Sequence, residues 1–248
     1  MQALWKGNLI AAGGDAKTTK GNGDEFVTAI MYLKPFKTLG VNLCANAESA
    51  QCFGPCLNSA GRGQMDSVQK GRLRKTLWFI RDRDSFMAQL VKDSESFVKW
   101  CSKKKVTPCI RPNGTSDIRF ELIPVYRKGI RFPNIFTAFP EVQWYDYTKL
   151  ANRRGIPANY HLVWSYSGAN PKYAAQESFA KANGMNIAVV FRDKGGIPAV
   201  FLGLPTINGD RDDLRFLDPK GVVVALYAKG QAKQDQSGFV VDTQGVTA

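Results

Sequence analysis

The chain has 248 residues, of which 44% are hydrophobic and 22% are charged, and this balance excludes a disordered or collagen-like protein. It carries 34 Lys and Arg against 21 Asp and Glu, so its formal net charge is +13. This excess favours a polyanionic partner, most often nucleic acid or a nucleotide, although a basic surface can also serve solubility alone. No apolar run approaches the roughly 18 residues of a membrane span, and the N-terminal apolar stretch is too short for a signal peptide, so we expect a cytoplasmic protein.

Residues 13–24 are rich in Gly and Lys and are expected to form a loop, without the order of a phosphate-binding P-loop. We predict a flexible segment over residues 1–24 and a single domain over residues 25–248. Strands are expected at residues 26–33, 41–43, 106–111, 142–147, 160–166, 186–191 and 222–227. Helices are expected at residues 65–81, 84–103 and 173–183, with a short one within 122–139.

Strands that alternate with helices predict an α/β domain with a mainly parallel sheet, most simply an incomplete parallel barrel. Asp84 is expected to cap the second helix and Gly184 to end the third. The runs at 186–191 and 222–227 are apolar throughout, which is typical of strands buried on both faces.

Polar side chains follow several of these strands. Because the carboxyl ends of parallel strands meet at one edge, we expect a shared site there, unless these residues only form ordinary polar loops. The residues predicted as catalytic are Ser116, Asp117, Asp146 and Lys149, and those predicted to bind a cofactor are Asn113 and Ser165.

Three of the five cysteines, Cys44, Cys52 and Cys56, lie within a loop over residues 44–63, straight after an expected strand. Thiolates are suited to zinc or to an iron–sulfur cluster, and three cysteines on a [4Fe–4S] cluster leave one iron open. A closed zinc site needs a fourth ligand, which Cys101, Cys109 or His161 could supply. Three unrelated buried thiols are the alternative.

The stretch LCANAESAQCFGPCLNSAGRG (43–63), followed by VQKGRLRKTLWF (68–79), resembles an uncharacterised family of bacteriophage proteins. The runs IRPNGTSDI (110–118), VQWYDYTK (142–149) and DLRFLDPKG (213–221) resemble the same family, so the resemblance covers most of the chain. The family is similar, more distantly, to radical-SAM-like phage proteins with a three-cysteine loop. The resemblance implies a cluster-bearing partial barrel in the cytoplasm of a bacterial host, but it does not establish chemistry with S-adenosylmethionine. A [4Fe–4S] cluster is the expected cofactor, S-adenosylmethionine is a candidate beside it, and zinc is the alternative.

The C-x7-C-x3-C spacing of this loop differs from the C-x3-C-x2-C of classical radical SAM enzymes, and no clear glycine-rich SAM motif is present. In the family comparison Cys44, Cys52 and Cys56 match the cysteine triplet. The pair Ser116 and Asp117 matches the polar motif that ends a later strand.

Basic residues are concentrated in the helix expected at 65–81, where they could neutralise phosphates, with Trp78 available to stack on a base. A solvated basic face with its aromatics in the core is the alternative. Arg62 stands between two glycines, where a mobile guanidinium is well placed to reach a phosphate. The residues predicted to contact nucleic acid are Arg62, Lys70, Arg72, Arg74 and Lys75.

Two other features favour structural roles. The aspartates within residues 208–218 could hold Mg²⁺, but Asn208-Gly209 is a strong turn signal and we predict a turn. His161 is the only histidine and no catalytic triad can be identified, so we expect it to be structural.

The leading hypothesis is a phage-encoded iron–sulfur protein, radical-SAM-like, that acts on nucleic acid or a nucleotide. The second is a DNA- or RNA-binding protein with a structural zinc site and no catalysis, and a third is a host-directed interaction protein. No oligomeric state follows from the sequence.

Overall fold

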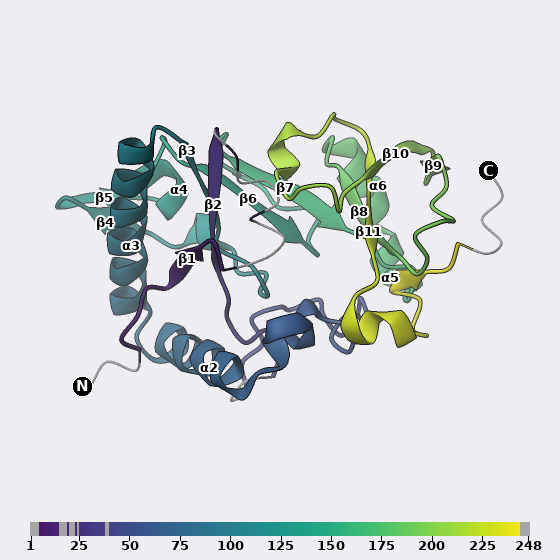
Figure 1. The fold of residues 1–248 in the computed structure, drawn as a ribbon, viewed down its shortest axis with the longest axis horizontal. Helices are drawn as coiled ribbons and strands as arrows, with labels where there is room; N and C mark the ends of the chain where they lie inside the picture. The colour runs from purple at the N-terminus through teal and green to yellow at the C-terminus, as the bar shows by residue number, and fades with distance from the viewer. Residues whose placement is uncertain (1–4, 15–18, 20–22, 24, 38–39, 244–248) are drawn as a thin grey trace. The chain divides into compact units, whose positions relative to one another are not determined.

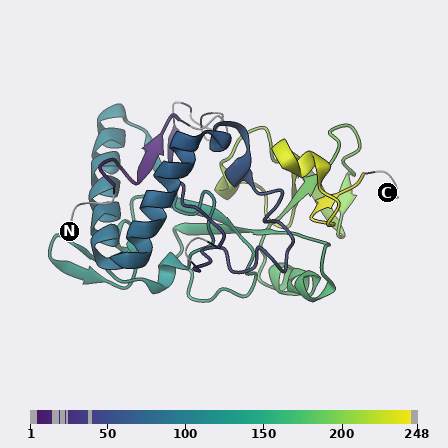
Figure 2. The same cartoon turned by 90° about the horizontal axis from the view of Figure 1, so that it is seen from below.

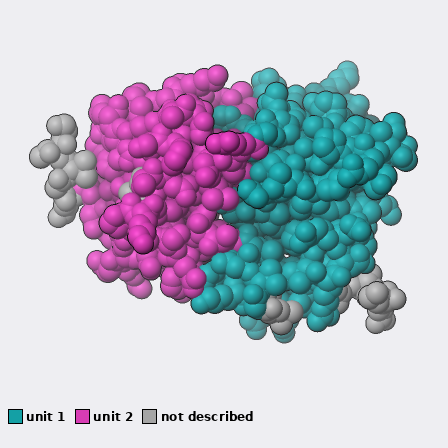
Figure 3. Space-filling model, turned by 180° about the vertical axis from the view of Figure 1, so that it is seen from behind, with its two compact units in different colours: residues 1–43, 65–146, 155–161 teal, residues 44–64, 147–154, 162–248 magenta. Residues whose placement is uncertain are grey.

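The computed structural model describes residues 5–14, 19, 23, 25–37 and 40–243. The chain divides into two compact units (Figure 3). Unit 1 contains residues 1–43, 65–146 and 155–161, and unit 2 contains residues 44–64, 147–154 and 162–248. Most of the loop predicted over residues 13–24 lies outside the described part of the chain.

The described residues of unit 1 form strands of the main sheet, a separate hairpin and several helices (Figure 1). Its main-sheet strands, in the order β1-β2-β3-β6, are β1 (Ile10–Ala12), β2 (Phe26–Met31), β3 (Thr107–Arg111) and β6 (Gln143–Thr148, of which the last two residues belong to unit 2). Strands β2, β3 and β6 are parallel, and β1 pairs with β2 in the antiparallel sense. The remaining elements are α2 (Asp66–Arg81), α3 (Arg83–Lys104), η3 (Phe120–Leu122), β4 (Val125–Arg127), β5 (Ile130–Phe132) and α4 (Ile135–Ala138).

The helices α2 and α3 are joined at a corner at Asp82, where Trp78 and Phe79 of α2 pack edge-to-face on Phe86 of α3 (Figures 1 and 2). The apolar residues of α3 recur at helical spacing, as the sequence predicts, whereas the sequence indicates α2 as a basic helix. The predicted cap at Asp84 is wrong. Asp82 is the N-cap, because its carboxylate accepts the backbone N–H of Ser85 at 3.2 Å.

Unit 2 has a parallel core with an antiparallel edge. Its strand order is β7-β8-β11-β10-β9, and β12 pairs with β8. The strands are β7 (Tyr160–Ser165, of which the first two residues belong to unit 1), β8 (Ile187–Phe191), β9 (Val200–Phe201), β10 (Leu204–Asn208), β11 (Val223–Tyr227) and β12 (Val240–Val241). The helices are η1 (Leu57–Ser59), η2 (Gly61–Gln64), α5 (Pro171–Ala174), α6 (Gln176–Ala182), η4 (Arg215–Leu217) and η5 (Gly230–Gln234).

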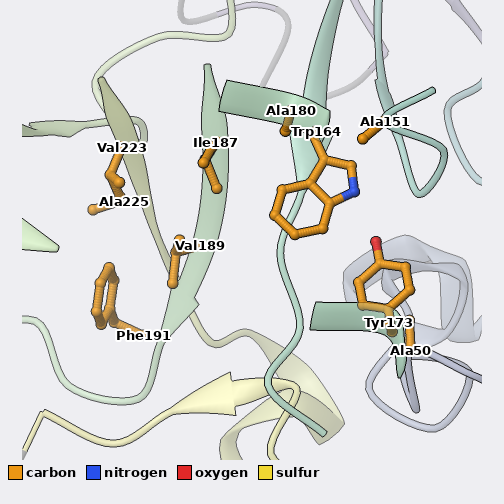
Figure 4. Packing of buried hydrophobic residues seen from close by; sticks show 10 residues of the cluster. All are labelled: Ala50, Ala151, Trp164, Tyr173, Ala180, Ile187, Val189, Phe191, Val223 and Ala225. Carbon is orange, nitrogen blue, oxygen red and sulfur yellow. The ribbon is translucent and has the colours of Figure 1, made fainter. Parts of the chain in front are cut away.

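The core of unit 2 is formed by apolar side chains of three neighbouring strands (Figure 4). Trp164 of β7, Val189 of β8 and Val223 of β11 are all fully buried. Ala50 of the 44–63 loop belongs to the same cluster, so this loop is packed onto the core of its unit.

The prediction of an α/β protein with mostly parallel strands is confirmed. Among the described residues β1 and β9 each have one strand neighbour, and no closed barrel is present. The strand expected at 41–43 is wrong, since only Val41 makes an isolated bridge. The helix expected at 173–183 is divided at Ala175 into α5 and α6, and Gly184 follows α6 with a φ of 62°. No helix in the described part of the chain has the length and apolar character that a membrane crossing needs.

Candidate functional site

The first candidate site is a buried polar network near the carboxyl ends of β3 and β6, in unit 1. The backbone N–H of Asn113 donates to both carboxylate oxygens of Asp146, at 3.1 Å and 3.2 Å, and Asn113 Nδ2 donates to Oδ2 at 3.3 Å. Ser116 Oγ donates to Asn113 Oδ1 at 2.8 Å. Three residues predicted for one strand edge therefore lie in direct contact, as parallel strand ends require.

Two further residues of this network, Tyr160 and Arg111, were not predicted from the sequence. The Tyr160 hydroxyl donates to Asp146 Oδ2 at 3.0 Å, and Arg111 Nε lies 3.9 Å from Asp146 Oδ1. Arg111 is the last residue of β3, so its position at a strand end could have identified it as a member of the site. Tyr160 begins a strand among other apolar residues and gave no such signal.

The network is closed to solvent in this structure. Asp146 is 0% exposed and Asn113 is 4% exposed. A buried carboxylate is stable only when donors satisfy it. Asn113 and the Tyr160 phenol donate to Asp146, and the Arg111 guanidinium adds an opposite charge at 3.9 Å. This geometry favours a positioning role for Asp146. The catalytic role predicted for Ser116, Asp117, Asp146 and Lys149 stays a prediction.

The positioned element is the turn over residues 113–118. Asn113 Oδ1 accepts the backbone N–H of Ile118 at 2.8 Å, and Asp117 donates its backbone N–H to Leu43 O at the same distance. A Cβ on Gly114 would lie 2.6 Å from Met31 O, so only glycine lets the turn approach the end of β2 this closely. The half-buried side chain of Asp117 is carried on this turn.

Lys149 and Ser165, the other predicted members, belong to unit 2 and contact each other there. Lys149 is 6% exposed, and its Nζ donates to Ser165 O at 3.0 Å and to Tyr166 O at 3.3 Å. The ammonium also lies 4.5 Å from the centroid of the Phe239 ring and 5.5 Å from that of Tyr173. Carbonyl oxygens and ring faces stabilise a buried positive charge, so Lys149 ties the end of β7 to the C-terminal segment.

The 44–63 loop lies beside this lysine within unit 2. Ser167 Oγ donates to Ala50 O at 2.8 Å, which joins the loop to the segment that follows β7. Cys52 packs against the cluster that contains Phe239, the ring contacted by Lys149. The structure thus places the predicted cysteine loop and two predicted pocket residues, Lys149 and Ser165, in one unit.

The three sulfurs of the loop are half-buried and each described bond is local. Cys52 Sγ donates to Ala47 O at 3.8 Å, and Cys56 Sγ caps η1 by accepting the backbone N–H of Asn58 at 3.4 Å. In the described ranges no group of three or more His, Cys, Asp or Glu side chains is arranged to hold a metal ion. The donor chemistry of the three thiols suits zinc or iron.

Cys101 and Cys109 belong to unit 1 and are fully buried. Burial raises the pKa of the Cys101 thiol to about 11, and burial together with the neighbouring Cys101 raises the pKa of Cys109 to about 12. Such thiols stay protonated near neutral pH, which makes them poor metal ligands as they stand.

The predicted nucleic-acid residues of α2 divide into two groups. Lys70 and Arg74 are exposed. Arg72 is 7% exposed, and its guanidinium lies 4.6 Å from the centroid of the Tyr32 ring. The Lys75 ammonium lies 5.5 Å from the centroid of the Trp5 ring. Lys70, Arg74 and Arg81 follow one another at spacings of four and seven residues, which places three exposed cations on one stripe of the helix.

Arg62 is exposed on η2 of unit 2, between Gly61 and Gly63, as the sequence indicated. The nucleic-acid role of all five predicted residues stays a prediction.

The aspartate-rich segment forms a turn, as predicted. Asn208 Oδ1 accepts the backbone N–H of Asp210 at 3.0 Å. Arg215, which is 1% exposed, pairs with Asp212 at 3.0 Å and with Asp218 at 3.2 Å. These carboxylates therefore surround a buried guanidinium, which gives the segment a structural role.

The parallel strands, the helices that join them and the polar side chains at the strand ends define a mixed α/β protein. The chain belongs to the Gene product 88 family, a phage-type family whose model matches residues 7–243. The resemblance to a phage family is thereby confirmed over most of the chain. No curated protein and no solved structure matches the chain.

Proposed function

We propose that the protein binds nucleic acid or a nucleotide through its exposed basic side chains. The observation that carries this proposal is the net charge of +13 together with the exposed stripe of Lys70, Arg74 and Arg81 on α2. Phosphates attract such a stripe without regard to base sequence, and each contact releases condensed counterions. Arg72 and Lys75 belong to the same helix and pack on aromatic rings, and their charges add to the positive potential of α2.

The test is the salt dependence of binding to a labelled 20-nucleotide single strand and to the matching duplex. We expect the logarithm of the association constant to fall linearly with the logarithm of salt concentration. The double variant Lys70→Gln/Arg74→Gln should lower the magnitude of this slope by about 1.5, since each phosphate contact contributes about 0.7 to 0.9. Glutamine preserves helix propensity at both positions.

The matched control is Lys220→Gln/Lys233→Gln, which removes the same charge from two exposed lysines of unit 2. If binding is independent of salt, direct phosphate contact is refuted. If the two double variants lose the same slope, binding depends on total charge and α2 is not the contact surface.

A metal centre on the 44–63 loop is the second candidate, because three half-buried thiols occur within 13 residues of one loop. This second candidate has two forms. In the first, the loop holds a [4Fe–4S] cluster that works with S-adenosylmethionine on an incomplete barrel and acts on nucleic acid. In the second, the loop holds a structural zinc ion. Metal content and visible absorbance of protein purified without oxygen, beside a Cys56→Ala variant, test it. Iron and sulfide that are lost in the variant support the cluster, and stoichiometric zinc without colour supports the binding protein. Folded protein that contains neither metal refutes both forms.

A further inference from the structure

The hairpin of β4 and β5 in unit 1 is a two-stranded sheet of its own. Arg127 pairs with Ile130 in the antiparallel register, so only Lys128 and Gly129 form the turn. Both have positive φ, 51° and 79°, as a type I′ turn requires. This turn matches the twist of the two strands and defines which side chains share a face.

One side of the hairpin is fastened to the rest of unit 1. Val125 is buried, and Arg127 Nη2 pairs with Glu141 at 2.7 Å while its Nε pairs with Glu95 of α3 at 3.4 Å. The same guanidinium lies 3.8 Å from the centroid of the Phe139 ring. Figure 1 shows the hairpin beside α3. The hairpin is therefore a fixed platform.

The other side presents an aromatic ring beside a guanidinium. Tyr126 is 66% exposed, and it stands directly opposite Arg131, which is also exposed. Directly opposed residues of antiparallel strands point to the same face. Ile130 stands opposite Arg127 and therefore belongs to the other face of the hairpin, where it is 61% exposed near the turn.

The charge of this surface has one sign. Residues 122–133 contain three basic side chains and no acidic one. Arg127 is paired with glutamates, whereas Arg131 has no ion-pair partner within the described part of the chain. Lys128 is exposed at the turn and interacts electrostatically with Glu141, whereas Arg131 stands opposite Tyr126. The hairpin itself contributes no acidic side chain.

We propose that this hairpin is a stacking site for single-stranded nucleic acid, in which Tyr126 stacks on an unpaired base and Arg131 and Lys128 contact the adjacent phosphates. This inference rests on the proposed function and assigns it a second contact surface, specific for unpaired bases. An aromatic ring binds the face of any base, and neighbouring cations follow the backbone, which is the combination that single strands select. A duplex keeps its base faces stacked and cannot use Tyr126.

The test compares Tyr126→Ala with Tyr126→Phe in binding to the same labelled single strand and duplex. We expect Tyr126→Ala to weaken single-strand binding about tenfold, within the range of base–aromatic stacking, and to leave duplex binding and the salt slope unchanged. Tyr126→Phe keeps the ring and should bind within twofold of the wild type. Arg131→Gln should lower the single-strand salt slope by about 0.7, and Lys220→Gln should not.

The outcomes separate this proposal from the broader one. If the wild type binds and all hairpin variants bind equally well, the hairpin proposal is overturned while the α2 proposal stands. An equal loss for single strand and duplex overturns stacking. If the wild type binds no nucleic acid, both proposals fail. Tyr126-dependent binding of polyglutamate without nucleic-acid binding would instead identify an acidic protein as the partner.

Discussion

The Tyr160 hydroxyl donates a hydrogen bond of 3.0 Å to Oδ2 of Asp146, although the two residues belong to different strands, β7 and β6. The same oxygen accepts the side-chain amide of Asn113, which follows β3. The Asp146 carboxylate therefore joins the segment that follows β3 to Tyr160, the first residue of β7. The network gives this part of unit 1 a single arrangement, because each donor has an acceptor only when the strands are in register.

Replacing Asp146 with Asn is expected to destabilise the protein by about 3 kcal/mol. The substitution leaves Arg111 without its buried counter-charge and replaces one acceptor oxygen with an NH2 group, a donor that faces the donors of Asn113 and Tyr160. Tyr160→Phe should cost about 1.5 kcal/mol, since it removes one hydrogen bond to a charged group. Urea denaturation measures both. Tyr126→Phe, which removes an exposed hydroxyl, is the control and should cost under about 0.5 kcal/mol. Equal stability of Asp146→Asn and wild type would show that the network contributes nothing.

Gly114→Ala should destabilise the fold by more than about 2 kcal/mol. The new Cβ would lie 2.6 Å from Met31 O and 2.8 Å from the Tyr32 ring, and the backbone oxygen cannot move without disturbing the end of β2. Gly195→Ala is the matched control, because nothing lies within 4 Å of the Cβ it would add. Thermal unfolding of the two variants measures the difference. A Gly114→Ala protein as stable as Gly195→Ala would contradict the close approach of the turn to β2.

The elements that the sequence predicted well are those whose signal is local. The helix α3 carries a long apolar repeat, and β8 and β11 are continuous apolar runs. The hairpin of β4 and β5 was not predicted, because Pro124 and Pro133 argue against strands in this segment and Lys128-Gly129 is a weak turn signal. Strand β10 was missed because it contains Pro205, which argues against a strand when no pairing is known.

The candidate site was predictable in part for the same reason. Asn113, Ser116 and Asp146 come together because strand ends converge in parallel sheets, which is a rule of topology. The contribution of Tyr160 depends on a side chain that reaches across to the next strand, and spacing along the chain does not contain that information. The packing of Arg72 on Tyr32 could not be predicted from the sequence either, because a charged residue on a basic helix is expected to face solvent.

Lys75 should make the stability of the protein depend on pH above about 8. Burial, with a smaller contribution from the positive charge of Arg72, lowers its pKa from 10.5 to about 8. Between these two values the unfolded chain holds a proton on Lys75 that the folded chain does not, so the contribution of Lys75 to the free energy of unfolding rises as the pH rises from about 8 to about 10.5. We expect this contribution to change by about 3 kcal/mol.

The measurement is urea denaturation of wild type and Lys75→Met across that pH range. Methionine keeps the packing against Trp5 and removes the titration, so Lys75→Met should be the more stable protein at pH 7 by about 3 kcal/mol. The difference should shrink toward pH 10.5. Lys70→Met, at an exposed position of the same helix, should show no such convergence. A constant difference between Lys75→Met and wild type would mean that Lys75 keeps an ordinary pKa in the folded protein.

The five thiols should divide into two classes when the reduced, metal-free protein reacts with a disulfide reagent at pH 8. Cys44, Cys52 and Cys56 are half-buried on the 44–63 loop, whereas Cys101 and Cys109 are fully buried with raised pKa values of about 11 and about 12. Because only the thiolate attacks, the reactive fraction of the buried pair is about one in a thousand or less at this pH. We expect three thiols to react in the folded protein and the other two only after unfolding. Replacing the three loop cysteines with serine should abolish the fast phase and leave the slow one intact. Five equally fast thiols would show that Cys101 and Cys109 are accessible and would restore them as candidates for a fourth metal ligand.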